Sequence, residues 1–290
     1  MRLLLVALLL LVAPAAIRAR STPEMLELRQ GTPVTIRRDR AYILFRTERP
    51  PGVPSVEPIF LRVPTATEVE AYSAARLEAF RIAEPELRRR REAQISRNHQ
   101  PVDPEPNPEN FVFNSETLQN VHYVDAGRPF VRGRPESVYL VETPPGDYVL
   151  YGATYAGPGF TLCFCLGTVG FSAPAGVVTD LGHFLGDMVH RTSVIPELSA
   201  ESGFGPSVNS YMVLLGGTVR PAPAGLSVPE GLQSATIRRA EYHAVGRFVE
   251  HAATQINRLA PVAGVLAYDR GRVIDVRSGR EVPDVSPDIP

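Results

Sequence analysis

The sequence predicts a mainly β protein, an antiparallel β-sandwich with one helical insertion. Short runs of β-branched and aromatic residues recur along the chain, and turn residues separate them. The 290 residues include 28 prolines and 23 glycines, which interrupt helices and central strands and which fall mainly between those runs. Helical spacing of apolar residues is sustained in one long stretch, so a helical bundle is excluded.

The first strand signals lie between residues 27 and 63. Residues 41–45 and 59–63 are rich in aromatic and β-branched side chains. Thr35 and Ile36 give a weaker signal of the same kind, and a Pro-Pro-Gly run at 50–52 marks a turn. We therefore expect strands joined by turns before the helix begins.

The stretch 66–97 predicts the helical insertion. Val69, Tyr72 and Phe80 recur at helical spacing and describe one apolar face. Thr67 is the expected N-cap, because its hydroxyl can accept a hydrogen bond from an amide of the first turn.

Proline shapes the second half of this insertion. Pro85 lacks the amide proton that the helical ladder needs, so we expect it to end or kink the first helical piece. A second, arginine-rich piece over 86–97 follows. Residues 101–110 contain four prolines among acidic residues and asparagines, which predicts an extended surface loop.

Strand signals return after this loop. They cover residues 111–113, 137–141, 148–151, 160–171, 177–182, 207–215, 236–239, 262–268 and 272–276. The stretch 160–171 is apolar on both faces, which is typical of a central strand. Residues 242–259 predict a further helix, and 283–290 predict a flexible tail. Residues 20–282 then form one domain of ordinary size for a β fold.

The N-terminal residues have the three parts of a secretory signal. A short charged start, Met1-Arg2, precedes an apolar run over 3–12, and a site of small residues follows. The run is too short for a transmembrane helix, which needs about 20 apolar residues. We expect a signal peptide over 1–19, cleaved after Ala15 or Ala19, and no transmembrane segment once it is removed.

The charge composition excludes a general affinity for nucleic acid. The formal net charge is −1, whereas nucleic-acid binders usually carry a concentrated basic face. All 30 basic residues are arginine. This bias is typical of a GC-rich coding sequence and indicates a bacterium, so we expect a periplasmic or secreted protein.

The order of strands and turns between Tyr139 and Gly182 resembles a known class of module. The residues that carry it are Val141, Pro145-Gly146-Asp147-Tyr148-Val149-Leu150, Cys163, Gly167-Thr168-Val169-Gly170-Phe171, Ala175-Gly176 and Leu181-Gly182. This order is similar to that of the transthyretin-like or carboxypeptidase-regulatory-like β-sandwich modules of bacterial envelope proteins. The resemblance implies a β-sandwich in the cell envelope and implies no catalytic residue.

Cys163 and Cys165 are the two cysteines of the chain. Residues two apart in a strand share a face, so both thiols are expected to point the same way. Their Cα atoms would lie about 6.5–7 Å apart, at or beyond the span of a disulfide. Three readings stay open: buried thiols, a strained redox-labile bridge and a thiolate site for Cu(I).

Asp180, His183, Asp187 and His190 are spaced by three, four and three residues. On a helix the four side chains would share one face and could bind Zn²⁺ through imidazole and carboxylate groups. A strand at 177–181, which the resemblance implies, would remove that alignment. These residues are the candidate metal site of an enzymatic alternative, a metal-dependent hydrolase.

Arg88, Arg89, Arg90 and Arg91 form the one local concentration of charge. The run is either a solvated helix face balanced by nearby glutamates or a contact for an anionic membrane surface, since guanidinium groups suit phosphate.

The chain contains no Gly-x-Ser-x-Gly turn, His-Glu-x-x-His motif or glycine-rich phosphate loop. We therefore expect an exported, non-catalytic envelope protein with a binding or structural role and no cofactor. Its expected partner is an envelope protein or an anionic membrane surface.

Overall fold

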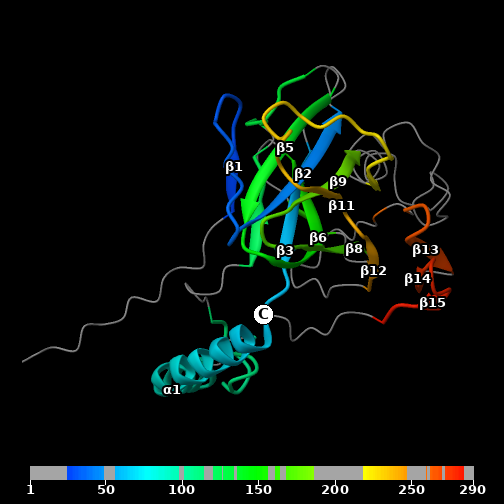
Figure 1. Cartoon of the computed structure of the whole chain (residues 1–290). Coiled ribbons are helices and arrows are strands. Elements are labelled where there is room, and N and C mark those ends of the chain that lie inside the picture. The colour runs from blue at the N-terminus through cyan, green and yellow to red at the C-terminus, as the bar shows by residue number, and fades with distance from the viewer. Residues whose placement is uncertain are drawn as a thin grey trace, which may run out of the picture.

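The computed structural model describes residues 25–48, 56–97, 101–113, 120–125, 127–133, 136–155, 161–163, 168–185, 218–246, 259, 262–269 and 272–283. Fifteen strands and one helix lie in these ranges, so the prediction of a mainly β protein is confirmed (Figure 1). No described helix is both long enough and apolar enough to cross a membrane.

The first sheet has six strands in the order β1-β5-β2-β9-β10, with β11 also paired to β9. The bounds are β1 Leu26–Leu28, β2 Ala41–Glu48, β5 Glu136–Thr143, β9 Val178–Leu185, β10 Thr218–Arg220 and β11 Ile237–Arg239. β9 runs parallel to β2 and to β11, whereas the other pairs are antiparallel. The sheet is therefore mixed rather than purely antiparallel.

The second sheet also has six strands, in the order β12-β8-β6-β3-β4, with β7 paired to β6. The bounds are β3 Val56–Arg62, β4 Val121–Tyr123, β6 Gly146–Tyr155, β7 Thr161–Cys163, β8 Thr168–Ala173 and β12 His243–Val245. All its pairs are antiparallel. A small third sheet joins β13 Leu266–Asp269, β14 Arg272–Asp275 and β15 Arg280–Glu281.

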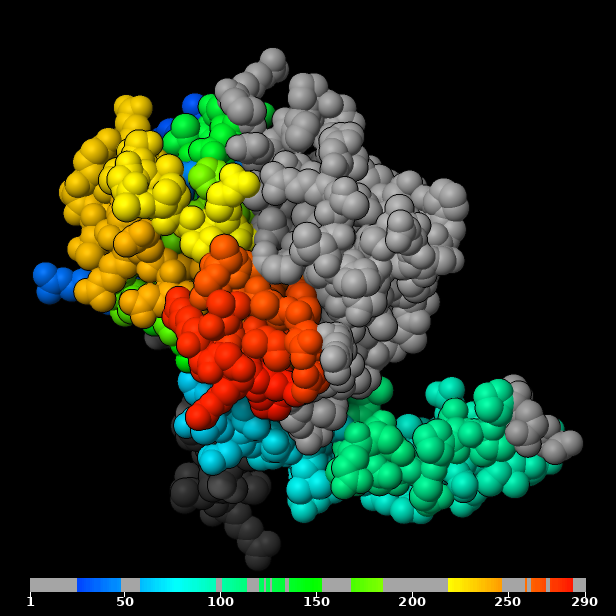
Figure 2. All heavy atoms as spheres, turned by 90° about the vertical axis from the view of Figure 1, so that its right-hand side faces the viewer, coloured from blue at the N-terminus to red at the C-terminus, as the bar shows by residue number. Residues whose placement is uncertain are grey.

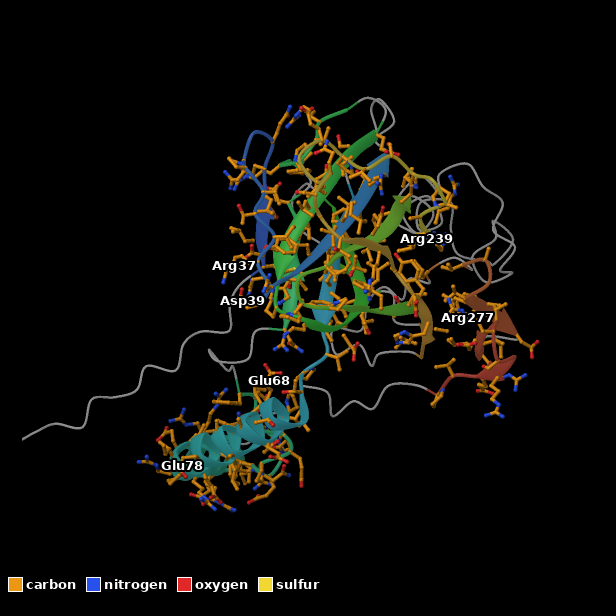
Figure 3. The ribbon with its side chains drawn as sticks, viewed as in Figure 1. Arg37, Asp39, Glu68, Glu78, Arg239 and Arg277 are labelled. Carbon is orange, nitrogen blue, oxygen red and sulfur yellow. The ribbon has the colours of Figure 1, made fainter. Side chains whose placement is uncertain are left out.

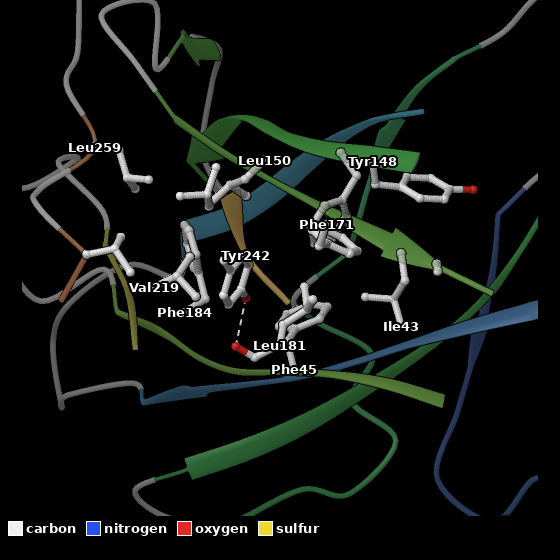
Figure 4. Close-up of a cluster of buried hydrophobic side chains, with 14 of the residues drawn as sticks. Ile43, Phe45, Tyr148, Leu150, Phe171, Leu181, Phe184, Val219, Tyr242 and Leu259 are labelled. Atoms are coloured by element: carbon white, nitrogen blue, oxygen red, sulfur yellow. Dashed lines mark hydrogen bonds between the residues drawn. The ribbon is translucent and has the colours of Figure 1, made fainter. Parts of the chain in front are cut away.

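One hydrophobic cluster takes side chains from both large sheets. Alternate residues of a strand point to the same face, so Ile43 and Phe45 of β2 reach the cluster together. The Phe45 ring stacks on Tyr139 of its own sheet at 5.0 Å and meets Phe60 of the second sheet edge-on at 6.0 Å. Figure 4 shows Ile43 and Phe45 in this cluster together with Phe171 and Tyr242. Full burial of an aromatic side chain of this kind contributes about 1.5–3 kcal/mol.

The opposite face of the first sheet carries a second cluster. Tyr42 and Leu44 of β2 lie there with Leu140, and Phe130 and Leu232 cover them from loops. β2 is therefore buried on both faces, which explains why residues 41–45 form a continuous apolar run instead of an alternating one.

Helix α1 runs without interruption from Ala66 to Ser96. Thr65, not Thr67, is the N-cap: its hydroxyl accepts from the amide of Glu68, and the Glu68 carboxylate accepts from the amide of Thr65. Only Phe80 of the helix is buried. The helix projects from the sheets, as Figures 1 and 2 show.

Pro85 was expected to end or kink the helix, and the structure shows that it does not end it. A proline in a helix interior costs about 3 kcal/mol, and residues 101–113 supply contacts on both sides of it. Before it, Phe80 packs edge-on against Phe111 at 5.7 Å. After it, Arg88 binds the Glu105 carboxylate. We call α1 together with residues 101–113 the arm.

Three other expectations need correction. Residues 111–113 form no strand, because Phe111 and Phe113 pack on the helix instead. The predicted helix at 242–259 is wrong at its start, where His243–Val245 form β12, and residues 247–258 lie outside the described chain. The stretch 160–171 contains two strands, β7 and β8. The strand expected at 207–215, the signal peptide and the tail from 284 also lie outside the described residues.

Candidate functional site

A buried charged cluster lies on the outer face of the first sheet, where β2, β5 and β9 run side by side. Arg46 of β2 donates a hydrogen bond from Nη1 to Oδ1 of Asp180 on β9 at 2.7 Å. Its Nε lies 3.8 Å from Oε1 of Glu136 on β5. The other oxygen of that glutamate, Oε2, lies 2.6 Å from Nε2 of His183. We call these four residues the Arg46 cluster.

A bulge in β9 brings Asp180 and His183 onto the same face. The register with β2 shifts there, so that Leu44 pairs with Asp180 and Arg46 pairs with His183. Gly182 takes a positive φ of 83°, a conformation that L side chains rarely adopt. Residues three apart therefore end on one face here, because the bulge adds a residue to β9.

The cluster is arranged as an ion-pair network with a guanidinium at its centre. The Asp180 carboxylate accepts from Arg46 and from the amide of Gly182. No group of three or more His, Cys, Asp or Glu side chains able to hold a metal ion occurs among the described residues. Asp187 and His190 lie outside the described ranges, so the four-residue zinc site stays a prediction.

A second polar cluster lies at the other end of the same face. Tyr42 donates from its hydroxyl to Oε2 of Glu142 at 2.9 Å. The other oxygen, Oε1, accepts from Nε of Arg40 at 3.1 Å and from Nη1 of Arg37 at 3.4 Å. Burial raises the pKa of Tyr42, and the hydrogen bond to Glu142 raises it further. The phenol therefore remains a donor at neutral pH.

An open depression of about 420 Å³ lies beside this second cluster. Arg37 and Asp39 pair at its rim, where both side chains are more than half exposed (Figure 3). Arg40 and Glu142 line it from below and are almost completely buried. Its remaining lining residues are Met25, Leu26, Pro144 and Pro145. We call this hollow the Glu142 depression.

Sequence reasoning missed the residues that make both clusters. Arg46 and Glu136 do not stand near Asp180 and His183 in the sequence, and strand pairing alone brings them together. One signal was present: Arg46 and Glu142 directly follow the predicted apolar strands 41–45 and 137–141, so a strand longer by one residue would place a charge in the sheet. A charge in such a position needs a buried partner.

The arginines at 88–91 of α1 form ion pairs with carboxylates of the arm itself. Arg88 contacts Glu84 and Glu105, and Arg89 contacts Glu86. In addition, Arg90 lies 3.5 Å from Asp103, and Arg91 lies 3.0 Å from Glu105. These pairs are mostly exposed, so water and salt screen them and each contributes little to stability. Contact with an anionic membrane surface stays a prediction, and any such surface would compete with these partners.

The cysteine prediction is tested only at the level of the backbone. Cys163 ends β7 and pairs with Gly152 of β6, while Cys165 lies outside the described residues. The three readings of this pair therefore stay open.

Comparison with protein-family models, characterised proteins and solved structures gives no match to this chain.

Proposed function

We propose that this chain is an exported β-sandwich protein of the bacterial envelope, transthyretin-like in organisation, that binds a small polar ligand without catalysing a reaction. The Glu142 depression is the observation that carries the binding role. Its volume of about 420 Å³ lies within the range of pockets for small molecules.

The sandwich arrangement is supported by the cluster that the two large sheets share. Phe45 and Tyr139 come from the first sheet, and Phe60 and Phe171 come from the second. Phe60 lies edge-on to Phe45 and to Phe171, so one continuous set of aromatic contacts links the two sheets. A core shared by two sheets is what a sandwich requires, so these contacts support the proposal.

The lining of the depression favours a zwitterion as ligand. Two guanidinium groups, of Arg37 and Arg40, balance two carboxylates, of Asp39 and Glu142. The exposed pair at the rim is weak and can exchange its partner for a ligand group at little cost. The prolines and Leu26 offer apolar surface to the uncharged part of the ligand. A small molecule with separated amino and carboxylate groups fits this lining.

The structure offers less support for catalysis. In the Arg46 cluster the Asp180 carboxylate already accepts two hydrogen bonds, and a guanidinium occupies the place where a cation would compensate the acids. The hydrolase alternative would require Asp187 and His190 to complete a metal site with His183. The predicted envelope partner remains compatible with a binding role, because the arm projects away from the sheets.

A thermal-shift experiment tests the ligand. Mature protein is titrated with glycylglycine as the zwitterion, acetate as the anion and ethylammonium as the cation. We expect glycylglycine to raise the melting temperature most, since it can engage both signs of charge. Arg37→Ala should abolish that rise, whereas Arg272→Ala, which removes an exposed arginine of the third sheet, should not. Equal responses of the two variants, or none in the wild type, would reject the site.

Cell fractionation tests the location. The full chain is expressed in a Gram-negative bacterium, and the N-terminal residue of the recovered protein is determined. We expect a periplasmic or secreted product that begins at Ala16 or Arg20. Recovery of uncleaved chain in the cytoplasm would contradict the export proposal.

A further inference from the structure

The arm is connected to the second sheet by two adjacent strands. β3 leads into the arm and β4 leads back from it, and the two pair over three residues, with Phe60 opposite His122. Beyond this pairing the amide of Arg62 donates to the carbonyl of Asn120 at 2.7 Å. The amide of Val63 donates to the carbonyl of Asp147 at 2.8 Å. We call this short region the root of the arm.

A single carboxylate ties the first turn of α1 to β3. The Glu68 side chain accepts from Nη1 of Arg62 at 3.1 Å and from Nη2 at 2.5 Å, a two-pronged contact. The same carboxylate accepts from the amide of Thr65 in the capping box. The contact with Arg62 is the main reason why the pKa of Glu68 falls to about 2. Glu68 therefore stays ionised in mildly acidic solution. Figure 3 shows it at the end of α1 nearest the sheets, with Glu78 farther along the helix.

His122 is buried beside this contact, and its Nε2 has no hydrogen-bond partner among the described residues. The residue is 8% exposed. Within the described part of the chain, His122 Nε2 and Arg62 Nε are buried nitrogens without a hydrogen-bond partner. Burial and the positive charge of Arg62 both disfavour the imidazolium form, and together they lower the pKa of His122 to about 4. A protonated His122 would be a second buried cation beside the first.

We propose that the root of the arm is an acid-triggered hinge, in which protonation of His122 beside Arg62 opens the β3–β4 pairing and releases the arm from the second sheet. This inference is independent of the proposed ligand site. In the described chain, the charged group that acts on His122 is Arg62 of β3. Arg62 in turn favours the ionised forms of Glu68 of α1 and Tyr148 of β6. The negative charge of Glu68 already balances Arg62 through two hydrogen bonds, so it does not also balance the positive charge of a protonated His122.

The arm has internal contacts that keep it together when the root opens. Tyr72 packs against Phe113 with ring centroids 5.5 Å apart and donates its hydroxyl to the Phe113 carbonyl. Arg76 donates to the carbonyls of Glu109 and Phe111. These contacts join α1 to residues 109–113, so the arm is expected to move as one unit.

The pH window follows from the two protonation states of His122. In the closed root the pKa of His122 is about 4, below the ordinary value of 6.5 that it regains when the root opens. Opening of the root is therefore favoured increasingly as pH falls from 6.5 to 4. Below pH 4 the opening constant no longer changes. Over this window the opening constant should rise by up to about tenfold per pH unit. Above pH 7 the hinge should stay closed.

Hydrogen exchange of the mature chain tests the hinge. Exchange is followed by mass spectrometry between pH 7 and pH 4, with rates corrected for the intrinsic effect of pH. Peptides that contain β4 and the first turns of α1 should lose protection as pH falls, whereas peptides from β2 should keep it. The imidazole titration of His122, followed by NMR, should give a midpoint near pH 4. Unchanged protection at the root, or an equal loss in β2, would overturn the proposal.

Variants separate the hinge from general acid sensitivity. His122→Gln should remove the pH dependence at the root, whereas His243→Gln, at an exposed position, should leave it unchanged. If His122→Gln fails to fold, Glu68→Gln provides the test: it should raise exchange at the root at pH 7, and Glu78→Gln should not. A root that responds to acid in His122→Gln as it does in the wild type would overturn the proposal. So would normal protection of the root in Glu68→Gln.

Discussion

Arg46 of β2 and Asp180 of β9 form a hydrogen-bonded ion pair at 2.7 Å, with side chains only 3% and 8% exposed. The two residues are 134 positions apart in the chain. They lie between parallel strands of a sheet that is covered on both faces, so neither charge can return to water without disturbing the sheet.

The first prediction concerns this pair. Asp180→Asn keeps the shape of the side chain but removes the negative charge that balances the buried guanidinium of Arg46. We expect a loss of about 3–5 kcal/mol in the free energy of unfolding, measured by urea titration with circular dichroism. Asp269→Asn, which breaks the exposed pair with Arg272, should cost much less, because solvent screens that pair. Equal costs for the two variants would show that the pair is not buried in solution.

The second prediction concerns the bulge. A Cβ at Gly182 would lie 2.2 Å from the carbonyl oxygen of Arg220, and Gly182 also has a positive φ. Gly182→Ala should therefore force β9 away from β10 and prevent a stable fold. Gly225→Ala is the matched control, because Gly225 has a similar φ of 80° with no atom near the added carbon. The control should lose only about 1–2 kcal/mol from backbone strain. Soluble expression and urea unfolding would measure both effects.

The third prediction concerns alkaline pH. Burial raises the pKa of Tyr148 to about 12, and burial raises that of Tyr242 well above its usual value. A raised folded pKa means that the stabilising contribution is complete below pH 10 and is lost as pH rises towards 12. Because the chain has ten tyrosines and no tryptophan, tyrosinate absorbance should show most phenols ionising before these two. Tyr148→Phe should weaken the loss of stability above pH 10. A titration with one midpoint for all ten would contradict this prediction.

The fourth prediction concerns the arginine run. Glu105 contacts both Arg88 and Arg91, and all three side chains are at least partly exposed. Glu105→Gln should therefore free these arginines and increase binding to anionic lipid vesicles at low salt, measured by co-sedimentation. Replacing Arg88 to Arg91 with Gln should abolish that binding. Glu78→Gln also removes one negative charge from the arm, but away from the arginine run, and it should bind like the wild type. Stronger binding by this control would indicate a simple effect of net charge.

The fifth prediction concerns metal. Since Arg46 holds Asp180, we expect untagged protein purified with zinc present to contain less than one zinc per chain by elemental analysis. His183→Ala should leave that content unchanged. One tightly bound zinc per wild-type chain, lost in His183→Ala, would instead favour the hydrolase alternative.

The helix shows where local reasoning succeeds and where it stops. Its position was predictable from the spacing of Val69, Tyr72 and Phe80, because that spacing is a local property of the chain. Its continuity through Pro85 was not predictable, because the contacts that hold it come from Phe111 and Glu105, beyond the helix. A strand over 177–182 was likewise expected, but its extension to Leu185 and its bulge were not.

The sequence by itself determined the mainly β class, the place of most described strands and the place of the helix, since alternation, turn residues and helical spacing act over a few residues. Only the tertiary structure decided which charges meet. Strand order placed Arg46 between Glu136 and Asp180, and it placed Arg40 beside Glu142. Pairing between distant strands depends on how whole faces are buried, and that is a property of the folded chain rather than of any local stretch.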